Sequence, residues 1–208
     1  QGDANEKNAG PQLGSRLDYH TNLNAIRISP ALLAAAGNAR VLELSTSSAE
    51  TVSLTAVSGL ENLAYRYALK ELNSFAVVGA NYGVHNQNGE LNLYDDATGQ
   101  GALTSNWIAD RAEMLQWAMV RNTKDIGGVI TGTTFNKEFT DANKGQILVG
   151  ATTQRAKVFF GNDADDLFSG SGFEDHLYGG KGYDNLQGLG GDDYLEGNEG
   201  DDEGPRPP

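Results

Sequence analysis

A tandem repeat of nine residues near the end of the chain constrains its fold more than any other feature. Leu167, Leu177, Leu186 and Leu195 follow one another at intervals of 10, 9 and 9 residues. Aligned on these leucines, the units are 160–168 (FGNDADDLF), 170–178 (GSGFEDHLY), 179–187 (GGKGYDNLQ), 188–196 (GLGGDDYLE) and a truncated 197–203 (GNEGDDE), with Ser169 left over as an extra residue. A period this short, repeated in tandem, indicates a solenoid.

Each unit has small or turn-forming residues first, an aspartate at the sixth place and, in the complete units, a leucine at the eighth. This pattern predicts a six-residue turn followed by a three-residue strand whose leucine points inward. A strand this short cannot stand alone. We therefore expect the units to wind into a right-handed coil, two units per turn, with strands stacked about 4.8 Å apart. The predicted fold of this segment is a short parallel β-roll, a right-handed β-solenoid.

The sixth-place aspartates, Asp165, Asp175, Asp184, Asp193 and Asp202, are the candidate cation ligands. With two units per turn, Asp165 faces Asp184, Asp184 faces Asp202, and Asp175 faces Asp193. Carboxylates about 5 Å apart repel by roughly 1 to 3 kcal/mol, so the coil needs a counter-ion. Glycines let backbone carbonyls turn toward the same point, which predicts a cage of oxygen ligands that suits Ca²⁺ better than Mg²⁺.

The predicted calcium ligands combine these carboxylates with the backbone or side chains of neighbouring turn residues. They are Asn162, Asp163, Asp165, Gly170, Gly172, Asp175, Gly180, Gly182, Asp184, Gly190, Asp193, Gly200 and Asp202.

The charge of the chain supports a cation as its partner. Of a net charge of −13, the segment 161–203 carries −12, from nine Asp, four Glu and one Lys. Such a segment argues against a nucleic-acid or anionic-membrane partner, because phosphate binding needs basic patches.

No apolar run approaches the roughly 18 residues of a transmembrane segment. The chain has no cysteine, which excludes disulfides, thiolate metal sites and cysteine catalysis.

These units resemble the repeats of the RTX family, the glycine-rich nonapeptide proteins exported by Gram-negative bacteria. The unit 179–187 (GGKGYDNLQ) matches the family consensus at every specified place. The resemblance implies calcium binding, export by type I secretion machinery, and folding outside the cell once calcium binds. Three residues depart from the consensus: Asp163 and Phe173 replace a fourth-place glycine, and Leu189 replaces a second-place glycine. We expect weaker calcium sites at these positions, most of all where Phe173 would have to adopt a left-handed turn.

The residues before the repeats predict a mixed domain with both helices and strands. The expected elements are a short helix over 31–36, a strand over 40–45, a helix over 59–72 behind a Ser58/Glu61 capping box, a helix over 106–121 with an Ile108, Ala112, Leu115 and Met119 stripe, and hairpins within 129–160. The predicted organisation is an α+β front domain (1–159), a calcium-binding β-roll (160–203) and a tail (204–208).

The front domain carries no catalytic signature, because GxSxG, HExxH, P-loop and GxGxxG motifs are all missing from it. Residues 64–120, including YALKELNSFAVVGANYGVHNQNGELNLYDDATGQG, are similar to the segment before the repeats in type I-secreted RTX exoproteins such as lipases.

The sequence supports three hypotheses about function. The chain is a calcium-dependent secretion module at the C-terminal end of an extracellular exoprotein, the post-catalytic part of a secreted lipase or other hydrolase, or an adhesin or toxin module that binds a host-surface or lipid ligand. Whether the parent protein is an enzyme stays open.

Overall fold

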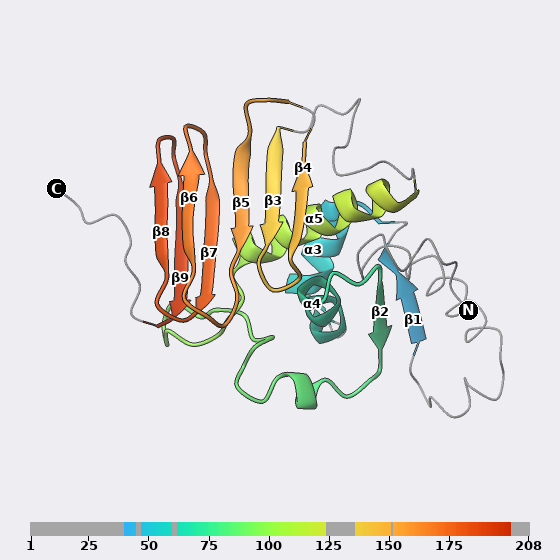
Figure 1. Ribbon diagram of the computed structural model, residues 1–208. Coiled ribbons are helices and arrows are strands. Elements are labelled where there is room, and N and C mark those ends of the chain that lie inside the picture. The colour runs from blue at the N-terminus through green and yellow to red at the C-terminus, as the bar shows by residue number, and fades with distance from the viewer. Residues whose placement is uncertain (1–39, 45–46, 60–61, 124–135, 151, 201–208) are drawn as a thin grey trace. The chain divides into compact units, whose positions relative to one another are not determined.

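The computed structural model describes residues 40–44, 47–59, 62–123, 136–150 and 152–200. The chain divides into two compact units, Gln1–Lys124 and Asp125–Pro208 (Figure 1). The helix predicted over 31–36 and the predicted ligand Asp202 lie outside the described residues.

In its described residues, the front unit combines a two-stranded antiparallel sheet with three α-helices, as the α+β prediction requires. Its described elements are β1 (Arg40–Glu43), α3 (Ala49–Val57), α4 (Asn62–Lys70), β2 (Phe75–Val78), the 3₁₀ helix η3 (Gly83–His85) and α5 (Ser105–Thr123). Strand β1, which the sequence predicted, pairs with β2.

Helix α5 confirms the predicted apolar stripe. Ile108, Ala112 and Leu115 have no exposed surface, and Met119 is 8% exposed. Helix α4 lies within the helix predicted over 59–72, but the assignment of Ser58 as its N-cap was wrong. The Ser58 hydroxyl donates to the carbonyl of Leu54 at 2.9 Å, so Ser58 ends the preceding helix α3 instead.

The second unit is a β-solenoid built from two sheets. Its strands are β3 (Lys137–Asp141), β4 (Gln146–Val149), β5 (Ala156–Phe160), β6 (Leu167–Ser171), β7 (His176–Lys181), β8 (Asn185–Leu189) and β9 (Tyr194–Glu199). One sheet has the order β4-β3-β5-β7-β9, and the other contains β6 and β8 (Figure 1). The antiparallel pair β3 and β4 is a hairpin of the kind predicted before the repeats, and the other strand pairs described in this unit are parallel.

The strand register confirms two nonapeptide units per turn. Leu177 pairs with Leu195, Phe168 with Leu186, and Phe159 with Leu177, so each strand lies beside the strand 18 residues away. The buried side chains of Phe159, Leu177 and Leu186 form the core between the two sheets, and Phe168 and Leu195 pack against it.

The first unit of the repeat is shifted by one residue from the predicted alignment. Leu167, used as a marker of the inward place, is 74% exposed and pairs with Asn185. Phe168 points inward instead, and its ring stacks on that of Phe159 with centroids 3.9 Å apart. The first unit is therefore 161–169, its sixth residue is Asp166, and Ser169 is its ninth residue and not an insertion.

The parallel strands begin upstream of the acidic, glycine-rich segment. Strand β5 pairs with β7 in the same 18-residue register that joins the repeats to one another. Residues 152–160 therefore take the position of one complete nine-residue unit in the solenoid. Their sequence, TTQRAKVFF, contains no glycine and no aspartate. The change in composition near Phe160 thus marks where the consensus sequence begins, while the parallel ladder already includes β3 and β5.

Candidate calcium-binding turns

The turns between the strands stack in two columns, which position the candidate calcium ligands. We call the turns 161–166, 179–184 and 197–200 column A, and the turns 152–157, 170–175 and 188–193 column B. Backbone hydrogen bonds join successive turns. In column A the Lys181 N–H donates to the Asn162 carbonyl at 2.9 Å, and in column B the Gly190 N–H donates to the Ser171 carbonyl at 3.2 Å. Residues far apart in sequence thereby become neighbours in each column.

The sixth-place aspartates link each turn to the one before it. The N–H of Asp166 donates to Oδ1 of Asp184 at 2.9 Å, and the N–H of Asp175 donates to Oδ1 of Asp193 at 3.0 Å. Asp175 and Asp184 have no exposed surface. The predicted pairing of Asp175 with Asp193 is therefore present, whereas the predicted partner of Asp184, Asp165, is replaced by Asp166.

In Asp166 and Asp175, the Oδ2 atom closes the turn to which the aspartate belongs. Oδ2 of Asp166 accepts the N–H of Asn162 at 2.9 Å, and Oδ2 of Asp175 accepts the N–H of Ser171. An ionised carboxylate is an acceptor only, and backbone N–H groups are suitable donors for it. Asp175 thus fixes its own turn through Oδ2 and holds the turn before it through Oδ1, which accepts the N–H of Lys157. Each sixth-place aspartate adds one negative charge to its column.

Glycine at the second and fourth places allows the turns to stack closely. Gly180 has φ +105°, and a Cβ there would lie 2.4 Å from the carbonyl oxygen of Asn162. Gly182 has φ +119°, and a Cβ there would lie 2.7 Å from the carbonyl carbon of Ala164. Only glycine adopts this conformation without strain and leaves room for the neighbouring carbonyl. The space between turns is therefore lined by backbone oxygen and carboxylates.

The turns that lack these glycines have a different conformation. Ala164 and Phe173 occupy the fourth place of their units and do not have a positive φ. The second-place side chain closes these turns instead, since Asn162 Oδ1 accepts the N–H of Ala164 at 2.7 Å and Ser171 Oγ accepts the N–H of Phe173 at 3.2 Å. The strained left-handed turn expected at Phe173 is thus avoided, and the side chain is 41% exposed.

The donor chemistry of the columns fits a hard cation. Within the described residues, no group of three or more His, Asp or Glu side chains is arranged to hold a metal ion. A cation here would need backbone carbonyls in addition to one carboxylate per turn, which is a set of oxygen ligands with no nitrogen or sulfur. Ca²⁺ accepts such a set because its coordination is flexible and takes six to eight oxygens.

The structure places the predicted ligands in both columns. Asn162, Asp163, Asp165, Gly180, Gly182, Asp184 and Gly200 lie in column A, and Gly170, Gly172, Asp175, Gly190 and Asp193 lie in column B. Asp165 stands at the fifth place, where its Oδ1 accepts the N–H of Tyr183 at 2.9 Å. The sequence alignment missed Asp166, although a constant period of nine, with Phe168 at the eighth place, would have found it.

Comparison with known proteins identifies the repeats. Residues 169–203 match the model of the RTX calcium-binding nonapeptide repeat, which spans four copies. No curated protein and no solved structure matches the chain. Among the helices that the structure describes, none combines the length and the apolar character needed to cross a membrane. The matched segment covers the stacked turns from the end of the first unit onward, so the chain carries calcium-binding RTX repeats.

Proposed function

We propose that calcium binds between successive turns of columns A and B and makes the folding of the repeats depend on calcium. The observation that carries this proposal is the complete burial of Asp175 and Asp184 within stacked turns of a segment with a charge of −12. Burying an ionised carboxylate costs several kcal/mol unless hydrogen bonds and a positive charge compensate for it. A divalent ion between the turns would supply positive charge close to the carboxylates of both.

We infer three calcium sites between turns. Two lie between described residues, Asp166 and Asp184 in column A and Asp175 and Asp193 in column B. The third is expected from the sequence alone, in which Asp202, outside the described residues, follows Asp184 by 18 residues. The carbonyl oxygens of the turn residues complete each site. Those turn residues are Asn162, Asp163, Asp165, Gly170, Gly172, Gly180, Gly182, Gly190 and Gly200.

Calcium binding of this kind supports a role in an exported protein. With a dissociation constant near 10⁻⁴ M and about 1 mM extracellular Ca²⁺, each site stabilises the fold by roughly 1.4 kcal/mol. Three sites then contribute about 4 kcal/mol outside the cell and almost nothing at cytosolic calcium concentrations. We therefore propose that the chain belongs to an extracellular protein that passes through type I secretion machinery unfolded and folds in the calcium-rich medium.

The folding proposal is tested by titrating the full chain with calcium and recording far-UV circular dichroism. Starting from a chelator, Ca²⁺ up to about 10 mM should produce a cooperative gain of β-structure, and the same concentration of Mg²⁺ should produce much less. An unchanged spectrum between chelator and saturating Ca²⁺ would overturn the proposal.

The export proposal needs a separate test. The protein is expressed in cells with and without a working type I exporter. Recovery of the protein in the medium only from cells with the exporter supports the proposal, whereas equal recovery from both cell types contradicts it.

A further inference from the structure

Lys157 occupies the place of a sixth-position aspartate in the turn that precedes the consensus repeats. Val158 pairs with His176 and Phe159 with Leu177, so Lys157 stands 18 residues before Asp175 in column B. The series of sixth-place residues in this column is therefore Lys157, Asp175 and Asp193. A cationic side chain thus begins a column that is otherwise acidic at this place.

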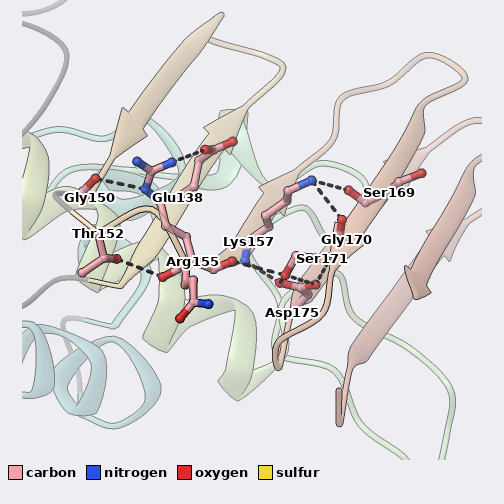
Figure 2. A network of polar contacts seen from close by, with 10 residues as sticks. Glu138, Gly150, Thr152, Arg155, Lys157, Ser169, Gly170, Ser171 and Asp175 are labelled. Atoms are coloured by element: carbon pink, nitrogen blue, oxygen red, sulfur yellow. Dashed lines mark hydrogen bonds and ion pairs between the residues drawn. The ribbon is translucent and has the colours of Figure 1, made fainter. Parts of the chain in front are cut away.

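The backbone of Lys157 makes the same link to the next turn as an aspartate does. Its N–H donates to Oδ1 of Asp175 at 2.5 Å, as the N–H of Asp175 donates to Oδ1 of Asp193 at 3.0 Å (Figure 2). The turn 152–157 therefore joins column B with the repeat geometry even though its sequence lacks the consensus residues.

The side chain of Lys157 donates hydrogen bonds to backbone carbonyls, which an ionised aspartate cannot do. Its Nζ donates to the carbonyl oxygens of Ser169 and Gly170, both at 2.9 Å (Figure 2). The same Nζ lies 5.6 Å from the ring centroid of Phe168. An ammonium group has three donors and no acceptor, so it can bind several carbonyl oxygens as a metal ion does. A positive charge is thus fixed beside the first interface of column B.

Neighbouring residues hold the turn of Lys157 in position. Arg155 donates from Nε to the Gly150 carbonyl at 3.0 Å and approaches Glu138 at 3.7 Å, and its own carbonyl accepts the Ser171 hydroxyl at 3.2 Å (Figure 2). These contacts tie the turn to the β3–β4 hairpin on one side and to the turn 170–175 on the other. None of them requires a bound ion.

We propose that residues 152–160 are a calcium-independent cap for the repeats, in which the Lys157 ammonium replaces the calcium ion of the other inter-turn interfaces. The inference builds on the proposed calcium sites. At this interface only one turn contributes a sixth-place carboxylate, Asp175, and the opposing turn contributes a cation. The interface between β5 and β7 can therefore form before calcium binds, and it offers the next repeat a preformed strand on which to stack.

Hydrogen exchange of the full chain, measured in chelator and in saturating Ca²⁺, tests the cap directly. In chelator, we expect the wild-type amides of the β5–β7 ladder to stay protected while those of the β7–β9 ladder exchange freely. Lys157→Met keeps a long apolar side chain but removes the charge and its donors, and should lower β5–β7 protection in chelator about tenfold or more. Lys157→Arg keeps the charge and should retain most of the protection.

Lys181→Met provides the matched control, because Lys181 also lies in the repeats but is 39% exposed and forms a surface ion pair with Glu199 at 3.7 Å. We expect this variant to leave β5–β7 protection in chelator unchanged. The cap is overturned if wild-type β5–β7 amides are unprotected without calcium, or if Lys157→Met protects them as well as the wild type does. Failure of the calcium proposal would appear elsewhere, as β7–β9 protection that does not respond to Ca²⁺.

Discussion

The two compact units differ in the charged side chains that they bury. Among the described residues, the front unit buries Arg66, Asp110 and Arg111, which are 6%, 5% and 3% exposed, whereas the charged residues buried in the repeat unit are all aspartates, with Asp175 and Asp184 completely buried. Arg66 donates to the carbonyls of Ala56 and Leu91, both at 2.9 Å, and Arg111 in the same way binds carbonyl groups at the end of α4. In both units, a buried charge organises backbone groups from separate segments.

The difference between the units lies in how the charge is balanced. Each arginine of the front unit is a single cation that satisfies several carbonyls, and burial lowers the pKa of Arg66 without removing its charge. The aspartates of the repeats recur in every turn, so their negative charge accumulates along each column. The arginines of the front unit find their partners within that unit, whereas we propose that the aspartates of the repeat unit need a bound cation.

Asp184→Asn should have the largest effect, and the effect should depend on calcium. The change keeps the shape of the side chain but removes its charge, at a position shared by both proposed sites of column A. We expect a loss of about 3 kcal/mol in the calcium-saturated stability of the repeat unit and a higher calcium midpoint. Denaturant unfolding at several Ca²⁺ concentrations measures both quantities.

The control is Asp192→Asn, the same chemical change at an exposed fifth-place residue. It should shift the calcium midpoint much less than Asp184→Asn. Equal shifts from the two variants would mean that calcium responds only to the overall charge of the segment and not to the stacked sixth-place carboxylates.

Arg66→Met should destabilise the front unit, independently of calcium. The change leaves the carbonyls of Ala56 and Leu91 without their guanidinium donors, which should cost about 2 kcal/mol or more. Unfolding followed by tryptophan fluorescence, which reports on Trp107 and Trp117 of the front unit, measures the loss. The comparison between the units fails if the cost of this substitution changes when calcium is removed.

Leu189→Gly should stabilise the repeats slightly. Leu189 has φ +77° at a second-place position and is 71% exposed, so it carries backbone strain without contributing much packing. Glycine removes a strain of about 1 to 2 kcal/mol, partly offset by its own conformational entropy. Asn198→Gly is the control at the same place of the next unit, where φ is +72°. Because asparagine tolerates this conformation, its replacement should gain less, and an equal gain would argue against strain at Leu189.

The smallest expected effect is a pH dependence of the front unit at high pH. Burial raises the pKa of Tyr82, whose hydroxyl donates to the Val77 carbonyl at 2.6 Å. The contribution of Tyr82 to stability should be complete below the ordinary tyrosine pKa of about 10 and lost as pH rises through the raised value. Unfolding measured from pH 8 upward should show this loss in the wild type, and Tyr82→Phe should remove it. A Tyr82→Phe profile identical to that of the wild type contradicts the assignment.

The sequence predicted the solenoid because its signal is a fixed period, which survives local substitutions. The period of nine was enough to place two units in each turn and to pair Asp175 with Asp193. It failed in the first unit, where Leu167 looks like the inward residue but Phe168 fills that place by stacking on Phe159. That error assigned the sixth place of the first unit to Asp165, whereas Asp166 occupies it.

Elements without a local signal were missed. Helix α3 contains five Thr, Ser or Val residues among its nine (AETVSLTAV), and its helical state depends on the burial of Val52 and Ala56 and on the Ser48 cap. Strand β5 belongs to the ladder of the repeats although residues 152–160 have no consensus glycine or aspartate. Phe159 packs in the core and the N–H of Lys157 binds Asp175, and these two contacts hold β5 in the ladder. Neither residue matches the consensus sequence of the repeats.

The most direct test of the account compares the two units within one sample. Hydrogen exchange of the full chain is followed by mass spectrometry in chelator and in saturating Ca²⁺, with peptides from α5 and from the β7–β9 and β6–β8 ladders read separately. Calcium should slow exchange in the two ladders by about a hundredfold or more, as expected for three sites, and leave α5 unchanged. Ladder amides equally protected in both conditions would contradict the claim that the stacked aspartates need calcium to fold.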